Sequence, residues 1–329
     1  MGLSRRDLVK SPLALAGASV IGLGAASAVT AQPTPSAAGE TIELWPRPPA
    51  GALHPGMTET IEETSTDAAY HSRRMKGILR PRMVTFPAAN PNGAAMLVIP
   101  GGGFAWNYFD HEGYYIADIL NRAGITCFVL FYRLPQDGWS NPATVALADT
   151  QRAMRLIRAN AGRFRIDPAR VGVVGFSAGG FLAATLATRH ATPFYEAVDA
   201  ADRLDARPLL AAPIYPVQTV DPAYAYEGVA PSLFGGKVTP ALIKAYSPDM
   251  NVTPAAVPTF LTHAEDDGLV PVANTTRFRD ALAAQKIVVE THLFARGGHG
   301  FGARPQAGNP GGIWPSLFLN FAREQKLFA

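Results

Sequence analysis

The chain has 329 residues, 48% hydrophobic and 17% charged, with a formal net charge of +3 at pH 7. Arg5, Arg6 and Lys10 against Asp7 place +2 of that charge in the first ten residues. The rest of the chain carries a net charge of only about +1. This charge gives no electrostatic reason to expect nucleic acid or an anionic membrane surface as a partner.

The N-terminus has the parts of a cleaved export signal. Paired Arg5 and Arg6 precede a stretch without charged residues over 11–39, rich in Ala, Gly and Leu. Small-x-small patterns up to Ala31 predict cleavage there, and the paired arginines indicate the twin-arginine export machinery. We therefore expect a periplasmic or secreted protein without stable membrane anchoring. The alternative is an uncleaved anchor, since the run approaches the ~20 residues that a membrane span needs.

The rest of the chain is expected to form one domain. Residues 32–56 contain several Pro and Ala and little periodicity, so we interpret them as a tether and lead-in. Residues 57–329 show no internal repeat and no second linker, and roughly 270 residues suffice for one large α/β domain. The lone Cys127 lies in the apolar run ITCFVLF, where a buried small hydrophobe is expected rather than a reactive thiol.

Apolar runs bounded by Gly and Pro alternate with helical patterns along this domain. A helix between the first two strands carries Ile116, Ile119, Leu120 and Ala123 at helical spacing, and Gly124 ends it. The strands are expected at 96–100, 125–131, 171–176, 209–214, 258–263 and 287–294, and the later helices at 144–162, 181–188, 272–284 and 313–325. Such alternation predicts an α/β fold with a mostly parallel sheet covered on both faces, whose ligand site lies beyond the carboxyl ends of the strands.

Three glycines follow the first of these strands, at 101–103. Consecutive glycines let backbone N–H groups approach a ligand without side-chain clash, as an oxyanion hole requires. Alone, the run would equally be a flexible turn, but a serine motif after a later strand favours Gly102 or Gly103 as an oxyanion donor. The aromatic residues that follow are expected to wall the substrate, with core packing as the alternative: Phe104, Trp106, Tyr108 and Phe109.

The strand at 171–176 runs into Gly-Phe-Ser-Ala-Gly-Gly and then a helical pattern. This is G-x-S-x-G between a strand and a helix, a sharp turn that projects Ser177 as a nucleophile. The backbone N–H of Ala178 is expected to complete the oxyanion hole. The alternative, a turn that holds a phosphate, needs a Lys or more glycines nearby, and the sequence offers neither.

A serine needs an adjacent base, and His299 is the strongest candidate among the seven histidines. It lies in the glycine-rich segment GGHGFG after the final strand, and the order serine, acid, histidine is typical of one class of hydrolases. The other histidines are expected in strands or at surface and capping positions: His263 and His292, and His54, His71, His111 and His190.

Glu265, Asp266 and Asp267 follow the strand at 258–263. One of them is expected to orient the base. Asp267 precedes Gly268 and can occupy the turn toward the site, Asp266 is the alternative, and Glu265 is expected to face solvent. The rival interpretations of the cluster are a glycosidase carboxylate pair and a metal site that includes His263.

Over about 41–326 the chain resembles bacterial acetylxylan-esterase-like carbohydrate esterases of the α/β-hydrolase fold. The resemblance rests on motifs in a specific order: IELWP, IPGGGF, HEGYYIADIL, FVLFYRLP, DTQRAMRLIRANA, IDPARVGVVGFSAGGFLA, IYPV, THAEDDGLVPVANT and GGHGFG. It implies a serine esterase without metal or cofactor, and it places the catalytic acid at the second Asp, Asp267. Phe104 stands where Tyr is usual, and Phe181 stands where His is usual.

The resemblance implies esters of sugars or similar small alcohols, free or in a polysaccharide. Acetyl is the expected acyl group because 191–250 offers only short, Pro-interrupted segments and no large apolar cap. The alternatives are a general carboxylesterase, a feruloyl-type esterase and a prolyl-type peptidase, which share the nucleophile machinery.

Overall fold

The computed structural model describes residues 38–54, 56–302 and 308–329. The expected signal segment and its cleavage position lie outside the described residues. Within those ranges no helix combines the length and the apolarity that a membrane crossing requires.

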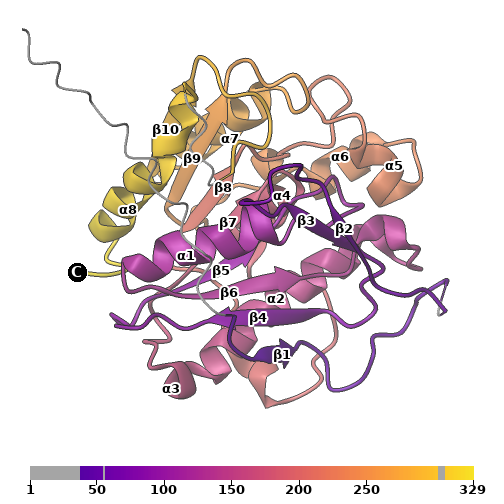
Figure 1. Ribbon diagram of the computed structural model, residues 1–329. Helices are drawn as coiled ribbons and strands as arrows, with labels where there is room; N and C mark the ends of the chain where they lie inside the picture. Colours follow the sequence, from indigo (N-terminus) through magenta and orange to yellow (C-terminus); the bar gives the residue numbers. More distant parts are fainter. Residues whose placement is uncertain (1–37, 55, 303–307) are drawn as a thin grey trace, which may run out of the picture. The chain divides into compact units, whose positions relative to one another are not determined.

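An eight-stranded sheet forms the centre of the domain (Figure 1). Six neighbouring strands are parallel, whereas β4 runs antiparallel to both β1 and β6, so the sheet is mostly parallel as predicted. In spatial order the strands are β1 (Thr41–Glu43), β4 (Arg82–Phe86), β6 (Thr126–Phe131), β5 (Ala95–Ile99), β7 (Val171–Phe176), β8 (Ala211–Ile214), β9 (Thr259–Ala264) and β10 (Val289–Phe294).

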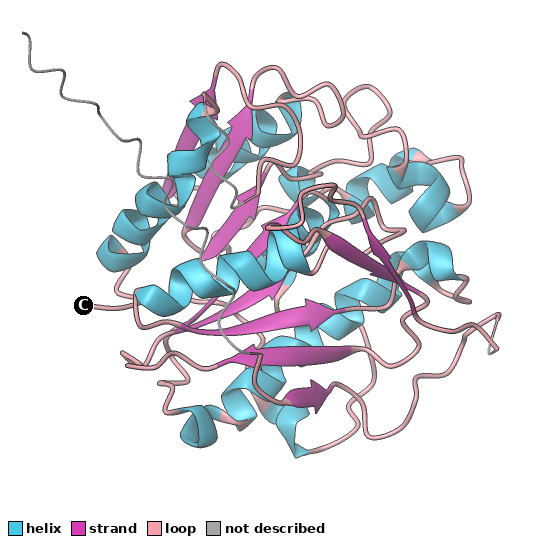
Figure 2. Cartoon of the chain, in the orientation of Figure 1, coloured by secondary structure: helices cyan, strands magenta, loops and turns pink. Residues whose placement is uncertain are grey.

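Helices cover both faces of this sheet, with α1 and α8 in front of it in Figure 1 and α2 behind it (Figure 2). A π-helical turn over Asp110–Tyr114, called the π-turn below, leads directly into α1. The helices are α1 (Tyr115–Arg122), α2 (Pro142–Ala159), α3 (Ala161–Phe164), α4 (Ala178–Arg189), α5 (Val229–Phe234), α6 (Pro240–Tyr246), α7 (Ala273–Ala284) and α8 (Trp314–Glu324). Between β8 and β9 the described chain forms only α5, α6 and a short 3-10 turn.

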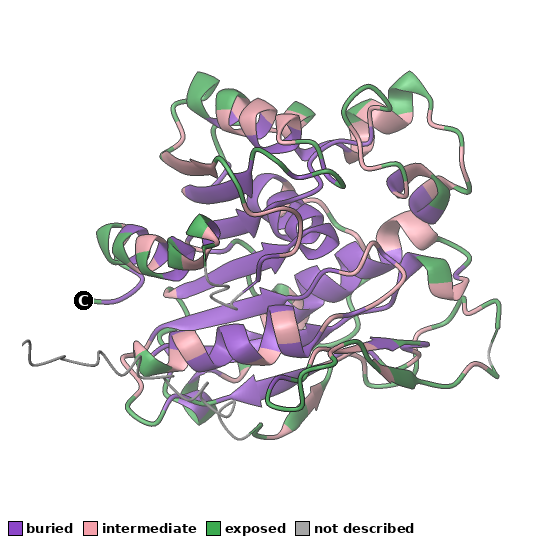
Figure 3. Ribbon diagram, turned by 45° about the horizontal axis from the view of Figure 1, so that its top comes forward, coloured by how far each residue is buried: buried purple, intermediate pink, exposed green. Residues whose placement is uncertain are grey.

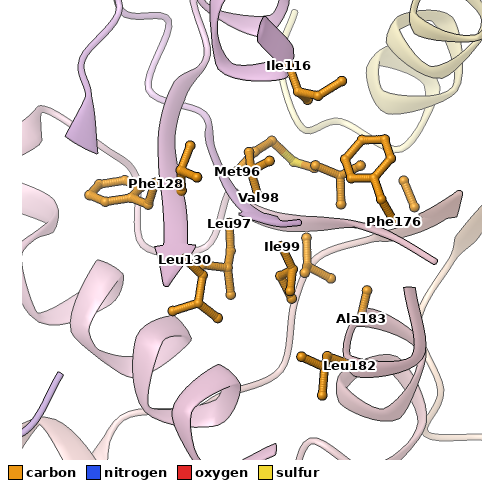
Figure 4. Close-up of a cluster of buried hydrophobic side chains, with 14 of the residues drawn as sticks. Met96, Leu97, Val98, Ile99, Ile116, Phe128, Leu130, Phe176, Leu182 and Ala183 are labelled. Atoms are coloured by element: carbon orange, nitrogen blue, oxygen red, sulfur yellow. The ribbon is translucent and has the colours of Figure 1, made fainter. Parts of the chain in front are cut away.

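The core lies between the sheet and these helices, and the central strands are buried on both sides (Figure 3). Side chains of β5 alternate between the two faces, toward Ile116 of α1 on one side and Leu182 of α4 on the other (Figure 4). Strands covered on both faces read as continuous apolar runs, which is why the sequence predicted them well. Cys127 is buried in β6, and burial raises the pKa of its thiol.

The segment expected to be a lead-in is partly folded into the domain. Residues 41–43 form β1, which pairs with β4. Immediately after it, Trp45 Nε1 donates a hydrogen bond to Asp149 at 2.8 Å, and Arg152 Nε donates to the Leu44 carbonyl at 2.8 Å. A three-residue strand is too short to show a period in the sequence, and its position depends on partners that lie about a hundred residues away.

A small antiparallel hairpin that the sequence did not predict lies outside the main sheet. It consists of β2 (Thr60–Glu63) and β3 (Arg73–Lys76), and Met75 of β3 forms an isolated bridge with Asn107. The strands are rich in charged residues, so they lack the alternation of apolar and polar residues that marks a half-buried strand. The loop between them, 64–72, reaches the cleft described next.

Candidate active site

The serine turn has the strained geometry that the G-x-S-x-G pattern predicts. Ser177 follows β7 and caps α4 with φ 52° and ψ −114°, a conformation rare for a residue with a side chain. A Cβ added at Gly175 would lie 2.2 Å from the Gly179 carbonyl oxygen, and one at Gly179 would lie 2.2 Å from that of Ile99. Only glycine fits at both positions, so the turn can bring β5, β7 and α4 this close together.

Ser177, His299 and Asp267 lie in one chain of hydrogen bonds. His299 Nε2 is 2.9 Å from Ser177 Oγ, and His299 Nδ1 is 2.7 Å from Asp267 Oδ2. Each residue follows the carboxyl end of a different parallel strand, β7, β9 or β10. The sheet therefore gathers at one edge three residues that span more than 120 positions of sequence.

The Asp267 carboxylate is surrounded by donors. Its Oδ1 accepts hydrogen bonds from the backbone N–H groups of Leu269 and Val270, both at 2.9 Å, while Oδ2 faces His299 and His263. Burial by itself raises the pKa of this carboxyl, but the hydrogen bonds from His263, His299 and the Val270 N–H together hold that pKa well below its usual range. Asp267 is thus kept ionised beside His299.

The three neighbouring acids occupy different environments. Asp266 Oδ1 accepts a hydrogen bond from the backbone N–H of Gly298 at 2.7 Å, so it holds the segment 297–302, called the His loop below. Glu265 is exposed, as expected. Asp267 Oδ1, and not Asp266, accepts the backbone N–H groups of Leu269 and Val270 in the turn after β9. Within the described residues no group of His, Cys, Asp and Glu side chains is arranged to hold a metal ion.

Backbone contacts fix the orientation of the peptide groups in the glycine run after β5. The Gly101 carbonyl accepts from the Tyr108 N–H at 3.2 Å, and the Gly102 carbonyl accepts from the Trp106 N–H at 3.0 Å. In a trans peptide the N–H points opposite to the C=O, so the N–H groups of Gly102 and Gly103 face away from these contacts. Neither group donates to an acceptor among the described residues, and neither does the N–H of Ala178.

These elements border a cleft of about 680 Å³. Its lining combines hydroxyl groups, aromatic rings and few aliphatic side chains: Thr64, Ser65, Tyr70, Ser72, Gly102, Gly103, Ala105, Trp106, Tyr108, His111, Glu112, Gln136, Ser177, Tyr226, Leu269, Val270, His299 and Gly300. Trp106 and Tyr108 line the cleft, the position that was predicted for them from the sequence. The hairpin loop 64–72 adds a wall that the sequence did not predict.

Phe104, by contrast, does not line the cleft, and its expected contact with substrate is wrong. It has φ 64° and a fully buried side chain that packs edge to face on Phe181, with ring centroids 5.7 Å apart. Phe109 is buried as well and packs against Tyr114 and Phe131. The two departures from the family pattern, Phe104 and Phe181, therefore meet in the core, where two apolar rings suit one another.

Two residues of the π-turn border the cleft without having been expected there. His111 was expected at the surface, but its Nε2 lies 2.7 Å from the Gly300 carbonyl oxygen. Glu112 is 5% exposed and accepts the Gly101 N–H at 2.7 Å. The available signal was the adjacent His and Glu that open the motif HEGYYIADIL, ahead of an amphipathic helix.

The sequence of the chain is similar to those of known hydrolases, among them an ester hydrolase. The BD-FAE family model matches residues 84–282. An acetylxylan esterase of Xylanibacter ruminicola is 32% identical over 230 residues, which cover 68% of this chain and 44% of that protein. Endo-1,4-beta-xylanase B of Butyrivibrio fibrisolvens is 33% identical over 62% of this chain and 32% of its own length. The chain thus spans less than half the length of these two curated relatives.

Solved structures extend the comparison over more than four fifths of the chain. An acetyl ester-xyloside bifunctional hydrolase from Caldicellulosiruptor lactoaceticus has a TM-score of 0.74 and 30% identity, covering 88% of this chain and 98% of that one. The carboxylesterase Cest-2923 from Lactobacillus plantarum, at 23% identity and a TM-score of 0.61, shares the fold. The expected α/β-hydrolase fold is confirmed.

Proposed function

The chain belongs to the BD-FAE family and is similar to acetylxylan esterases, and from this premise we propose that it is a serine esterase that removes short acyl groups, acetyl foremost, from carbohydrates such as xylan. The observation that carries the proposal is the hydrogen-bonded chain from Ser177 through His299 to Asp267, beside backbone donors that have no acceptor in the described part of the chain. The activities for which the similar proteins are named support the substrate class.

Acylation begins with attack of Ser177 Oγ on the ester carbonyl carbon while its proton passes to His299 Nε2. Asp267 holds the ring by Nδ1 and stabilises the imidazolium that forms. The N–H of Ala178, with that of Gly102 or Gly103, donates to the oxygen that becomes negative. The bond to the alcohol then breaks, His299 protonates the leaving oxygen, and the acyl group remains on Ser177.

Deacylation repeats these steps with water. A water molecule gives its proton to His299 and attacks the acyl carbon, and the same backbone donors hold the second oxyanion. As the bond to Ser177 breaks, His299 returns the proton to Oγ and the carboxylic acid leaves. The reaction thus consumes one ester and one water, and the chain's own groups carry every proton that moves.

The lining of the cleft supports a sugar as the alcohol. The hydroxyl-bearing residues Thr64, Ser65 and Ser72 of the hairpin loop line the cleft, and Trp106 and Tyr108 add aromatic surface. Aromatic faces and a few placed polar groups suit a polyhydroxylated ring. The sequence features of the first 31 residues lead us to propose export by the twin-arginine route to the periplasm or the medium.

A substrate panel with a matched serine variant tests the proposal. The protein is expected to release acetate from acetylated xylan without producing reducing ends, and to prefer p-nitrophenyl acetate over longer acyl chains, methyl ferulate and peptide anilides. Ser177→Ala is expected to abolish each of these activities while the thermal unfolding midpoint stays close to that of the wild type. An unchanged rate in Ser177→Ala would sink the assignment of the nucleophile.

A further inference from the structure

The π-turn directs three consecutive polar side chains to three different elements of the fold. Asp110 accepts two hydrogen bonds from the Arg73 guanidinium of β3, at 2.7 and 2.9 Å. His111 contacts the His loop, and Glu112 contacts the oxyanion loop, residues 101–103. Single π turns within helices are rare and occur often at functional sites. Glu112 has the contacts that bear most directly on the reaction.

Glu112 lies next to the nucleophile although the catalytic chain does not use it. A Cβ added at Gly101 would lie 2.8 Å from Glu112 Oε2 and 2.9 Å from Ser177 Cβ, so both residues border the same glycine. In the described part of the chain the carboxylate is held by two neutral donors and no ion pair: the Gly101 N–H at 2.7 Å and the Tyr215 hydroxyl at 2.8 Å. A buried carboxylate without a cation is costly to keep, which argues for a role other than stability.

Tyr215 carries the connection from Glu112 to the His loop. Its hydroxyl donates to Glu112 Oε1 and accepts the Gly302 N–H at 3.0 Å. Its ring packs edge to face on the His299 ring, with centroids 5.1 Å apart. Burial and then the charge of Glu112 raise the pKa of Tyr215 well above its ordinary value, so the hydroxyl keeps the proton that it donates.

His111 adds a second link from the same turn. Its Nε2 lies 2.7 Å from the Gly300 carbonyl oxygen, which only accepts, so Nε2 carries the hydrogen. Nδ1 then accepts from the Tyr70 hydroxyl at 2.5 Å. Gly298, before the base, is thereby held by Asp266, and Gly300, after the base, is held by His111.

We infer that Glu112, acting through Gly101 on one side and Tyr215 on the other, is a positioning residue that sets the oxyanion donors and the base His299 in register with Ser177. The Glu112 carboxylate fixes the peptide that opens the oxyanion loop, and the same carboxylate orients the ring against which the base packs. One side chain thus links the two elements that must act together in the transition state. This inference rests on the proposed serine-esterase chemistry.

The experiment compares Glu112→Gln, Tyr215→Phe and the double variant with Asp118→Asn, which alters a buried carboxylate of α1 that pairs with Arg122 instead. The readouts are kcat and KM for p-nitrophenyl acetate and the rate at which a p-nitrophenyl phosphonate ester reacts with Ser177. The phosphonate rate measures how well the serine and the oxyanion donors work together, and this measurement does not depend on knowing the natural ester substrate.

Glu112→Gln and Tyr215→Phe are each expected to lower kcat and the phosphonate rate about 10- to 100-fold, less than the ~10²–10³ typical of losing an oxyanion donor outright. KM is expected to change less than about threefold, and the double variant to lose no more than the worse single variant, because residues that act as a unit are not additive. Asp118→Asn is expected to keep the wild-type rate.

Wild-type kcat in either single variant, fully additive losses, or an equal loss in Asp118→Asn would overturn the inference. If Glu112→Gln does not fold, Tyr215→Phe decides alone, since it removes one oxygen and keeps the ring. A wild type that reacts with the phosphonate but leaves acetylated xylan intact contradicts the substrate assignment and not this inference. A wild type in which Ser177 does not react overturns both.

Discussion

Asp267 holds two histidines on one oxygen: its Oδ2 lies 2.7 Å from His299 Nδ1 and 2.9 Å from His263 Nε2. His263 is fully buried, and its Nε2 also lies 3.0 Å from the Val270 carbonyl oxygen. Because both of these partners only accept, Nε2 carries the hydrogen, and the Thr275 hydroxyl faces Nδ1 at 2.8 Å. His263 therefore fixes the carboxylate that in turn orients His299.

His263→Leu is expected to lower kcat and stability together. The variant removes a buried hydrogen bond to a charged acceptor, worth about 1.5–3 kcal/mol, and it frees the carboxylate to rotate. We expect kcat to fall roughly tenfold, the equivalent of about 1.4 kcal/mol. Steady-state kinetics and urea unfolding measure both effects. His263→Gln, which keeps a donor, is the control and recovers most of the loss; equal losses in the two variants would contradict the role of the donor.

Substituting the two adjacent aspartates one at a time is expected to lower kcat to clearly different extents. Asp267→Asn removes the charge that stabilises the imidazolium and favours the wrong tautomer of His299, so kcat is expected to fall up to ~10⁴-fold. Asp266→Asn keeps a side-chain oxygen for the Gly298 N–H, so its kcat is expected to stay within about tenfold of wild type. The comparison uses p-nitrophenyl acetate with both variants matched for folded fraction. A larger loss in Asp266→Asn would reverse the assignment of the acid.

The pH dependence of stability follows from the lowered pKa of Asp267. Its folded pKa lies below the unfolded value of ~3.9, so the unfolded state binds more protons and stability rises with pH in this window. The contribution is complete above the unfolded pKa and is lost as pH falls toward the folded pKa. The difference in unfolding free energy between wild type and Asp267→Asn, from urea titrations, is expected to be level above about pH 5 and to shrink at lower pH. If this difference in unfolding free energy grew as the pH fell, the pKa of Asp267 would be raised by folding and the prediction would be wrong.

The Phe104–Phe181 contact predicts a coupled pair of substitutions. Phe181→His alone places a polar ring in a dry core against Phe104, an unpaired buried group that costs about 1–3 kcal/mol of unfolding free energy. Phe104→Tyr together with Phe181→His supplies a hydroxyl and a ring nitrogen to one another, so part of that loss is expected to return. A double-mutant cycle in urea measures the coupling. Additive losses would show that the two positions do not act as a pair.

The sequence predicted the sheet and the serine turn better than the walls of the cleft. Central strands such as β7 are buried on both faces and therefore read as apolar runs, and the glycines beside Ser177 mark a turn that only they permit. The hairpin of β2 and β3 carries mainly charged side chains and depends on contacts with the π-turn, such as that between Arg73 and Asp110, which no local pattern records.

The sequence by itself determined the nucleophile turn and the glycine loop, because each depends on backbone geometry within a few residues. Only the tertiary structure decided where side chains point and which distant groups they meet. Phe104 turns into the core because of its left-handed backbone, and Trp106, two residues later, faces the cleft. Glu112 and His111 acquire contacts from residues that lie 103 and 189 positions away. Hydrogen bonds of that kind arise from the packing of the sheet edge, and local sequence spacing does not encode them.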